Sequence, residues 1–358
     1  MKKIFMLNKR LLKTFMSVSR YLSENLYIVF NEKINNYIIS ARFRWILFFK
    51  RELEYPIKKK PHPFPSIIQI QTINTCNASC KMCPYATNPP KETKRMSDEL
   101  FEKIIKEIIK ESKSTFIFLY LQNEPLMDND IFKKIKLIKR LSEETISTGL
   151  FTNGSLFTDK KIKELISSGN NVLIVSLDAF TQKTFNKIRK GLNFNHIVAN
   201  VNKIKNSKYS KTLAVEFTVQ KDNIKEFKQF IRFWKKQHVP VVVNYISNRS
   251  GDLKDFDEMS IPLPNIPFFR RWGVKVYKKI IKCCPAVLST FNILSNGDVI
   301  LCCNDYSKKL ILGNVNTSSI KEIWNGPKYQ KIREMFYNGE YRKIPTCRYC
   351  YNWKNNFL

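Results

Sequence analysis

The sequence predicts an α/β protein built on a parallel sheet. From about residue 66 onward, short β-prone runs alternate with amphipathic helical stretches. Strand followed by helix, repeated, implies a parallel sheet with helices outside it, either open or rolled into a barrel. Of the 358 residues, 43% are hydrophobic, which is enough for an ordinary core. The longest wholly apolar runs, such as Trp45 to Phe49, are far too short to cross a bilayer.

The first 65 residues are predicted to form a basic extension. Residues 1–62 carry fourteen Lys and Arg against four Glu. Apolar residues recur at intervals of three and four from Ile4 to Val29, which is typical of one helical face. Such a helix can dock its apolar stripe on the main domain, which we favour, or lie on an anionic membrane surface. The proline-rich run from Pro56 to Pro65 has the composition of a linker.

The central part, residues 66–250, carries the strand and helix alternation. Its β-prone runs predict strands, and its stretches with apolar residues at helical spacing predict helices between them. The expected strands are 67–72, 115–121, 145–151, 171–177, 212–220 and 239–245, and the expected helices are 98–110, 130–141, 159–167, 181–189 and 223–236.

Nine cysteines fall in clusters, without a recognisable signal peptide, and this favours metal ligation in a reducing compartment over disulfides. The first cluster reads Cys76-Asn-Ala-Ser-Cys80-Lys-Met-Cys83. Three thiolates at this spacing can turn toward one centre, but a four-iron four-sulfur cluster normally takes four from protein. One iron would then keep an open coordination position. A zinc knuckle, or cysteines that pack as small hydrophobes, are the alternatives.

Polar residues follow the predicted strands, at the carboxyl ends where such barrels carry their working groups. Glu124 and Asn153 follow the second and third strands, and Ser176 and Asp178 close the fourth. Plainer interpretations also exist: Glu124 as the neighbour of a helix cap, Asn153 as part of a turn, and Asp178 as a helix N-cap. Arg189 ends a predicted helix, and complementation of the helix dipole accounts for it.

The CxxxCxxC spacing together with these strand ends resembles the radical SAM superfamily. The resemblance implies a partial (β/α)6 TIM-like barrel, with a 4Fe-4S cluster whose open iron is chelated by S-adenosylmethionine. Glu124 stands in Asn-Glu-Pro where the family has Gly-Glu-Pro, so it would accept a hydrogen bond from the cofactor's amino group; Gln122 and Asn123 replace the usual glycines. The cluster ligands implied are Cys76, Cys80 and Cys83, and the cofactor-binding residues are Met82, Glu124, Asn153, Ser176 and Asp178.

Beyond residue 250 the alternation fades. Residues 251–282 have the composition of a linker, and residues 283–358 hold the other six cysteines. Asn296-Gly297 is a strong type I′ hairpin signal, so 291–294 and 299–302 are expected to be two strands that bring Cys284 and Cys302 near each other.

This cysteine-rich part resembles the SPASM auxiliary-cluster domain in its shortened, twitch-like form. The resemblance implies one second 4Fe-4S cluster held by four cysteines, while a four-cysteine zinc site is the alternative. Cys283 and Cys303 would be spare thiols, or one could replace its neighbour as ligand. The implied auxiliary ligands are Cys284, Cys302, Cys347 and Cys350.

The resemblance also implies an activity: a radical SAM oxidoreductase that reductively cleaves S-adenosylmethionine to a 5′-deoxyadenosyl radical, which removes a hydrogen atom from a substrate. The auxiliary cluster would accept the second electron. We expect oxidation of a small polar substrate, such as a sugar, an aminocyclitol or a phosphate- or nucleotide-linked derivative. Peptide or protein maturation is one alternative, and a non-catalytic iron–sulfur or zinc scaffold is another. The sequence identifies no catalytic acid or base.

The net charge of +32 would suit an anionic substrate or membrane surface. No basic block is interleaved with aromatic residues, so a nucleic-acid partner is not expected. The expected partners are an electron donor such as flavodoxin or ferredoxin and a small polar or anionic substrate, or a peptide. The expected location is the cytoplasm, with contact to the inner face of the membrane through residues 1–62 left open.

Overall fold

The computed structural model describes residues 61–112, 114–209, 211–261 and 283–350. The predicted amphipathic helix within residues 1–62 therefore falls outside the described residues. So does the larger part of the predicted linker, residues 262–282. The remaining chain carries the sheet, its helices and all nine cysteines.

A nine-stranded sheet organises the molecule, with strand order β11-β10-β9-β1-β3-β4-β5-β7-β8. The six strands from β1 to β8 in this order pair in parallel, as the alternation of strand and helix predicts. All six expected strands are confirmed, and the partial-barrel α/β fold with them. Their bounds are β1 Ile67–Ile70, β3 Phe116–Phe118, β4 Ser147–Thr152, β5 Val172–Ser176, β7 Thr212–Val219 and β8 Val241–Tyr245.

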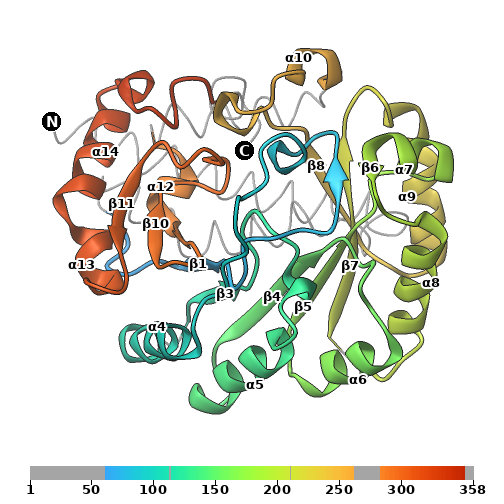
Figure 1. The fold of residues 1–358 in the computed structure, drawn as a ribbon, viewed down its shortest axis with the longest axis horizontal. Coiled ribbons are helices and arrows are strands. Elements are labelled where there is room, and N and C mark those ends of the chain that lie inside the picture. The colour runs from blue at the N-terminus through green and yellow to red at the C-terminus, as the bar shows by residue number, and fades with distance from the viewer. Residues whose placement is uncertain (1–60, 113, 210, 262–282, 351–358) are drawn as a thin grey trace, which may run out of the picture.

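Helices connect the parallel strands and lie outside the curved sheet (Figure 1). Several begin at side-chain caps: Ser97, Thr158 and Asn193 each accept a hydrogen bond from a first-turn N–H. One helix, α8, was not expected, although its apolar residues do have helical spacing. The bounds are α4 Asp98–Glu111, α5 Ile131–Leu141, α6 Asp159–Ser167, α7 Gln182–Ile188, α8 Phe194–Lys205 and α9 Phe227–Lys236, the last preceded by the 3-10 turn η3 Ile224–Glu226.

The two faces of the sheet carry different side chains. One face packs on the helices in the main core, where Ile68 and Ile117 meet Ile104 and Ile135. Because side chains alternate along a strand, the intervening residues lie on the opposite, inner face. That face is apolar toward the amino ends of the strands and polar toward their carboxyl ends. Its apolar cluster consists of Phe116, Val172, Ile174, Ala214 and Val242.

The C-terminal part continues the same sheet. Strand β9 (Thr290–Ile293) pairs in parallel with β1, in the register Ile68 with Phe291. Strands β10 (Asp298–Ile300) and β11 (Ile311–Asn314) then add antiparallel pairs. In Figure 1 these orange elements lie beside β1, opposite the green and yellow strands. Helices α12 Pro285–Ser289, α13 Ile320–Asn325 and α14 Pro327–Tyr337 accompany them.

The expected hairpin forms, but the type I′ assignment of its turn is wrong. A type I′ turn needs positive φ at both central residues. Here Gly297 has φ of +87°, whereas Asn296 does not have positive φ. The Gly297 N–H donates to Leu294 O at 2.9 Å, and the Leu294 N–H donates to Asp298 O at 2.8 Å. The glycine therefore serves a longer turn, with one left-handed residue at its end.

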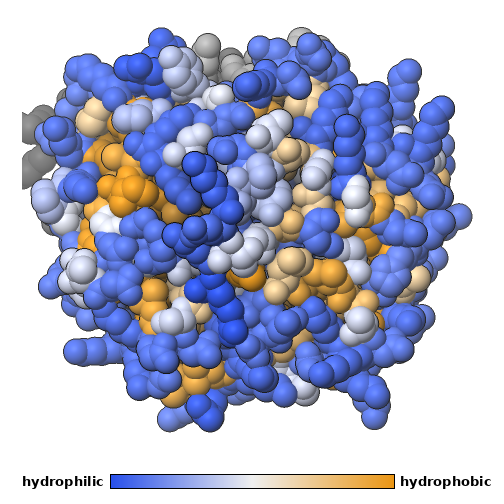
Figure 2. All heavy atoms as spheres, viewed as in Figure 1, coloured by the Kyte–Doolittle hydropathy of each residue, from blue (hydrophilic) through white to orange (hydrophobic). Residues whose placement is uncertain are grey.

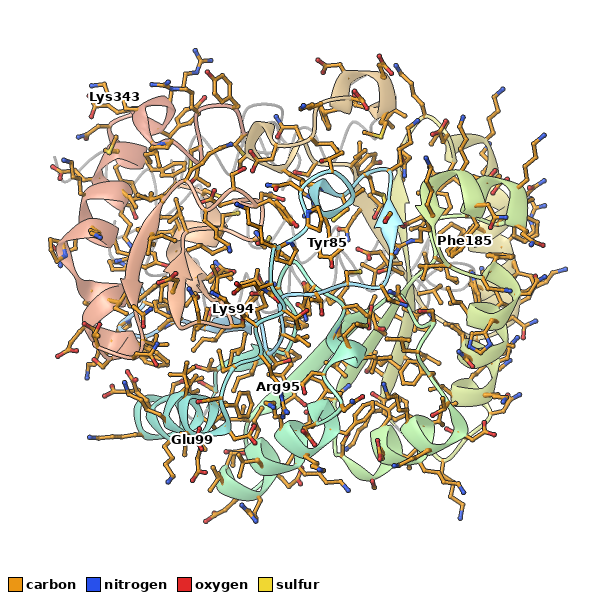
Figure 3. All side chains as sticks on the ribbon, in the orientation of Figure 1. Tyr85, Lys94, Arg95, Glu99, Phe185 and Lys343 are labelled. Carbon is orange, nitrogen blue, oxygen red and sulfur yellow. The ribbon has the colours of Figure 1, made fainter. Side chains whose placement is uncertain are left out.

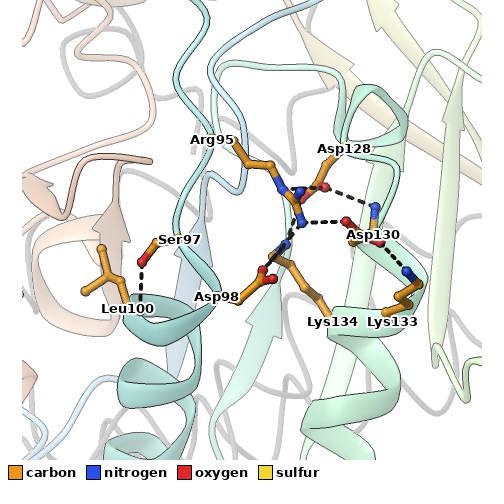
Figure 4. A network of polar contacts seen from close by, with 8 residues as sticks. All are labelled: Arg95, Ser97, Asp98, Leu100, Asp128, Asp130, Lys133 and Lys134. Carbon is orange, nitrogen blue, oxygen red and sulfur yellow. Dashed lines mark hydrogen bonds and ion pairs between the residues drawn. The ribbon is translucent and has the colours of Figure 1, made fainter.

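An ion-pair network ties the segment after the first cysteine cluster to α5 (Figure 4). Arg95 lies 3.2 Å from Asp128 and 2.6 Å from Asp130, and its backbone forms an isolated antiparallel bridge with Ile73. Lys134 of α5 lies 3.3 Å from Asp128. Because Lys134 and Asp128 are both buried, removal of either one would leave the other as an uncompensated buried charge.

Within the described residues, no helix is long and apolar enough to cross a membrane. Hydrophilic side chains cover most of the face shown in Figure 2, and apolar ones gather in separate patches.

Candidate cofactor and cluster site

The three cysteines of the first cluster lie on the loop after β1. Cys80 belongs to the short strand β2 (Ser79–Cys80), which pairs with β6 (Arg189–Lys190), and the Cys83 N–H donates to Cys80 O at 3.0 Å. The three thiols lie within electrostatic reach of one another. Burial raises the pKa of Cys76 to about 12 and that of Cys80 to about 11, with neighbouring Glu124 adding to both.

Three cysteine thiols are the type of ligand that iron–sulfur clusters take from protein. Without a metal, Cys76 and Cys80 stay protonated at neutral pH, and binding a cluster would convert them to thiolates and release protons. In the described part of the chain, no three His, Cys, Asp or Glu side chains converge closely enough to hold a single metal ion.

Hydrogen bonds to two strand ends hold the cysteine loop. Asn77, inside the motif, accepts from Asn153 Nδ2 at 2.8 Å and donates to Ser155 Oγ at 2.9 Å. Lys81, also inside the motif, lies 3.0 Å from Asp222 after β7. The predicted site residue Asn153 therefore positions the loop through its side chain.

Glu124 is buried and lies at the centre of these contacts. Its Oε1 accepts from Thr152 Oγ1 at 2.5 Å and from the Leu126 N–H at 3.0 Å, and its Oε2 accepts from the Asn153 N–H at 2.7 Å. A carboxylate has about four acceptor positions, so one position on Oε2 stays available to a donor such as an amino group. Burial raises the pKa of Glu124, against the effect of these hydrogen bonds. Glu124 also caps the 3-10 turn η2 Pro125–Met127. The predicted capping role of this segment and a role in cofactor binding are therefore compatible.

Asp178 forms a buried ion pair with Arg189, for which the sequence had predicted a different role. Arg189 is buried, and its Nε and Nη2 lie 2.8 and 2.5 Å from Asp178 Oδ2. The remaining oxygen of Asp178 accepts from the Thr218 N–H at 2.6 Å. The dipole interpretation of Arg189 is therefore wrong: its guanidinium points inward, with Nη1 4.0 Å from Cys80 Sγ. Nor is Asp178 the N-cap of α7, which is Thr181.

A second polar group occupies the inner face of the sheet near its carboxyl ends. Ser176 Oγ donates to Glu216 Oε2 at 2.6 Å, and Asn244 Nδ2 donates to Glu216 Oε1. Parallel pairing aligns these residues, because Ser176 is opposite Glu216 and Asn244 is opposite Thr218. Glu216 is not among the residues predicted from the sequence, although an acid between Ala214 and Thr218, on the inward side of a strand, is a visible signal.

Met82 lies in a separate apolar cluster with Ile188, Ile246 and Met259. Met259 belongs to α10 (Phe256–Met259), so the described part of the expected linker packs directly on the cysteine loop. Gln220 Nε2 donates to Met82 Sδ at 3.2 Å.

Several buried polar atoms around this site have no hydrogen-bond partner among the residues that the structure describes. They belong to Thr75 next to the first cysteine, Asn123 next to Glu124, and Gln220 beside Met82. Buried polar atoms are nearly always hydrogen-bonded in folded proteins. These unpaired atoms surround the three cysteines and Glu124, whose carboxylate still has an acceptor position available. The arrangement is therefore consistent with a polar cofactor bound at this site.

The C-terminal cysteines form a second group. Cys284 lies within electrostatic reach of Cys302, Cys303 and Cys350, and Cys347 lies within reach of Cys284 and Cys350. Burial raises the pKa of Cys284 to about 12. The Asn304 N–H donates to Cys302 Sγ at 3.5 Å, as expected for a sulfur that carries negative charge when it binds metal.

Gln122 connects the two cysteine groups. Its Nε2 donates to the carbonyl oxygens of Cys303 and Asp305, both at 3.0 Å. Its φ of +57° is the conformation that a glycine would adopt most easily. Tyr306 adds a second link, since its hydroxyl donates to Asn88 O at 3.0 Å. Figure 3 places Tyr85, which follows Cys83, between the C-terminal elements and the barrel strands.

Two family models match the chain. Residues 70–233 match the radical SAM superfamily, and residues 283–351 match SPASM, an iron–sulfur cluster-binding domain. A curated relative, the S-adenosyl-L-methionine-dependent 2-deoxy-scyllo-inosamine dehydrogenase of Niallia circulans, is 23% identical over 80% of this chain and 93% of its own length. The tungsten-containing aldehyde ferredoxin oxidoreductase cofactor-modifying protein of Pyrococcus furiosus is 26% identical over 46% of this chain and 47% of its own.

Solved structures share the fold. BtrN in complex with AdoMet and 2-DOIA superposes with a TM-score of 0.56 at 19% identity, over 80% of this chain and 93% of that one. Streptococcus suis SuiB bound to the precursor peptide SuiA gives a TM-score of 0.64 at 16% identity, over 84% of this chain and 72% of that one. The chain therefore carries a radical SAM domain followed by a C-terminal SPASM domain, and the cofactors of these domains are S-adenosylmethionine, a 4Fe-4S cluster and at least one auxiliary iron–sulfur cluster.

Proposed function

We propose that the chain is a dehydrogenase of a small polyol or aminocyclitol, acting at a carbon that carries a hydroxyl or amino group. The observation that carries the proposal is Glu216, held by Ser176 and Asn244 on the inner face of the sheet, beyond the apolar cluster. A carboxylate there can accept hydrogen bonds from substrate hydroxyls and receive the proton that oxidation releases. The dehydrogenase relative, matched over nearly its whole length, supports the same substrate class.

The proposed assignment of metal ligands follows the two cysteine groups. The first cluster would be held by Cys76, Cys80 and Cys83, because the thiols of these three residues lie on one loop. When bound, the clusters and S-adenosylmethionine supply one-electron chemistry that removes a hydrogen atom from carbon and accepts a second electron. The proposed auxiliary ligands are Cys284, Cys302, Cys347 and Cys350.

The proposed contacts to S-adenosylmethionine use the atoms left available at the strand ends. Glu124 Oε2 would accept from the amino group. Ser176 Oγ, whose own proton goes to Glu216, would accept from a ribose hydroxyl of the cofactor. Arg189 would contact the cofactor's carboxylate, with Asp178 orienting the guanidinium. Asn153 would keep the cysteine loop in register with β4, and Met82 would support the adenine from the apolar cluster.

The proposed partners follow from the chemistry. An external one-electron donor such as flavodoxin or ferredoxin would reduce the first cluster. The lysine-rich surface would suit an anionic form of the substrate, such as a phosphate. Residues 1–62 remain the proposed contact for any anionic membrane surface.

The test uses anaerobically reconstituted protein with S-adenosylmethionine, a reductant, and two substrate panels: polyols and aminocyclitols in one, and cysteine-, serine- or tyrosine-containing peptides in the other. We expect 5′-deoxyadenosine together with a product two hydrogens lighter from the first panel. Glu216→Gln should lower kcat/KM by about tenfold or more while 5′-deoxyadenosine release without substrate continues. Cys80→Ala should abolish both products.

Turnover confined to the peptide panel would contradict the dehydrogenase assignment and establish peptide maturation instead. Full iron and sulfide incorporation with no 5′-deoxyadenosine, using a physiological donor as well as dithionite, would favour the scaffold interpretation.

A further inference from the structure

Arg333 on α14 is buried without a counter-charge. Its side chain is only 3% exposed, and among the described residues no carboxylate pairs with it. Its Nη1 donates to Trp324 O at 2.8 Å, and the guanidinium lies 4.2 Å from the Trp324 ring centroid and 4.9 Å from that of Tyr329. Its Nη2 has no hydrogen-bond partner among the described residues. A buried cation that lacks an anion is strongly unfavourable, so this arrangement calls for a negative group that the described residues do not supply.

Arg333 is joined to the segment of the C-terminal cysteines, because its Nε donates to Val287 O at 3.4 Å, three residues after Cys284. Arg333 is within electrostatic reach of Cys283, which adjoins Cys284 and influences Cys347. Within the described part of the chain, the hydroxyl of Tyr329 also lacks a partner, and Tyr329 is within electrostatic reach of Cys302. Helix α14 packs on α12, which begins immediately after Cys284.

Arg333 remains a cation under ordinary conditions. Burial lowers its pKa to about 10, which still leaves the guanidinium protonated at neutral pH. The other cations near the auxiliary loop are already engaged: Lys309 lies 2.7 Å from Asp252, and Arg249 donates to Asn304 Oδ1. Arg333 is therefore the buried positive charge in this region that has no acidic partner among the described residues.

We propose that Arg333, assisted by the Tyr329 hydroxyl, is a positioning residue that raises the reduction potential of the auxiliary cluster. A four-iron cluster ligated by four thiolates is negatively charged, and reduction adds one more electron to it. A buried cation and hydrogen-bond donors beside the sulfurs favour the reduced form, and charge and hydrogen bonding are the main levers on the potential of such clusters. The inference rests on the assignment of the four C-terminal cysteines to that cluster.

The test measures a potential rather than an activity. The full-length chain with Cys76, Cys80 and Cys83 replaced by Ala keeps the auxiliary cluster as its one iron–sulfur centre. After anaerobic reconstitution, iron and sulfide content is measured, and the cluster is titrated with reductant and followed by electron paramagnetic resonance. The variants are Arg333→Gln, Arg333→Lys and Tyr329→Phe, and the matched control is Arg342→Gln, which removes an exposed positive charge from the same domain.

We expect Arg333→Gln to shift the midpoint to more negative potential, Tyr329→Phe to shift it less in the same direction, and Arg333→Lys to keep most of the original value. Arg342→Gln should titrate like the parent, because solvent screens its charge. If Arg333→Gln does not retain a cluster, recovery of cluster content by Arg333→Lys supports the charge role.

An Arg333→Gln variant with full cluster content and the parent's midpoint would overturn the inference. So would loss of the cluster from both Arg333 variants combined with an unchanged midpoint in Tyr329→Phe. A parent that binds zinc but neither iron nor sulfide would instead refute the cluster assignment itself, so the two failures are distinguishable.

Discussion

A single carboxylate links the cysteine loop to the neighbouring strand ends. The Glu124 N–H donates to Thr75 O at 3.0 Å, beside the first cysteine. Its side chain accepts from Thr152 at the end of β4 and from the N–H of the next residue, Asn153. Backbone and side chain of one residue thus join three segments. The position is sensitive because each of its oxygens already serves a buried donor.

We predict that Glu124→Gln weakens S-adenosylmethionine binding by about tenfold or more. The amide presents an NH2 group where the carboxylate accepted from buried donors, and it removes the negative charge that we propose faces the cofactor's amino group. Loss of a charged hydrogen bond costs about 1.5–3 kcal/mol. Equilibrium dialysis with S-adenosylmethionine on the reconstituted protein checks this. The exposed Glu99 provides the control, since Glu99→Gln should bind as the parent does.

Arg189 and Asp178 form a buried ion pair, so removal of one residue leaves the other as an unpaired buried charge. We predict that Arg189→Met lowers the free energy of unfolding by about 3–5 kcal/mol, because Asp178 remains as a buried charge. Adding Asp178→Asn should restore much of that loss. Urea denaturation of the two single variants and the double variant measures the coupling; additive effects would contradict it.

How far the sequence predicts these residues depends on the distance of their partners along the chain. Glu124 and Asn153 are predictable because Asn153 directly follows β4 and Glu124 lies six residues after the end of β3. Arg189 is not, because its position depends on the pairing of β6 with β2, about a hundred residues earlier. Glu216 likewise acquires its role from Ser176 on the adjacent strand.

At the scale of the element, the start of α7 is fixed from outside the helix. Glu226 of η3 accepts from the Phe180 and Thr181 N–H groups at 2.8 and 3.1 Å and from the Thr184 hydroxyl at 2.6 Å. Burial opposes ionisation of Glu226, but these hydrogen bonds outweigh it and lower its pKa below the ordinary 4.5. This contact holds the segment between β5 and β6, and so supports both Asp178 and Arg189.

We predict a pH dependence from this contact. A lowered carboxyl pKa contributes stability that is fully present above the ordinary value of 4.5 and is lost as pH falls through the folded-state pKa. Glu226→Gln should cost about 1 kcal/mol at neutral pH. This difference from the parent should shrink as the pH drops below 4.5.

Thermal unfolding of parent and variant from neutral to acid pH measures that difference. Glu258→Gln, at an exposed position, is the control. A Glu226→Gln deficit that stays constant with pH would contradict the prediction.

The presence of helices and strands was predictable where the hydrophobic periodicity was strong. The geometry of the turns was not predictable. The six parallel strands follow from β-prone runs of ordinary length, and the amphipathic helices from their apolar spacing. The hairpin at Asn296-Gly297 was placed correctly, but its turn type depends on hydrogen bonds that span Leu294 to Asp298. Local residue preference does not determine those.

At the scale of the molecule, the barrel and the C-terminal domain share one sheet. The sequence suggested two domains joined by a linker, since composition changes near residue 251 and the cysteines cluster beyond it. Strand β9 nevertheless pairs with β1 over four residues, and Trp324 Nε1 donates to His62 O at 2.7 Å. Pairing between strands so distant in the chain leaves no local signal in the sequence.

We predict that the two parts unfold together. Phe291→Ala in β9 and Phe230→Ala in α9, at opposite ends of the sheet, each remove a fully buried ring and should cost about 3–5 kcal/mol. Both variants should retain a single thermal transition. Hydrogen exchange in Phe291→Ala should accelerate in β1 and β3 as well as in residues 283–350; acceleration confined to the C-terminal residues would show two independent units.

The pairing of β1 with β9 also delays completion of the sheet during synthesis of the chain. Thr290 leaves the ribosome 223 residues after its partner Ile67, which is a delay of roughly 10–45 seconds at ordinary rates of synthesis. Throughout that interval one edge of β1 lacks its neighbour, and unpaired edges recruit strands from other chains. Two chains translated from neighbouring ribosomes on one mRNA could therefore pair through β1 before either chain has made its own β9. Slower initiation of translation increases the distance between ribosomes. It should therefore raise the yield of correctly folded protein.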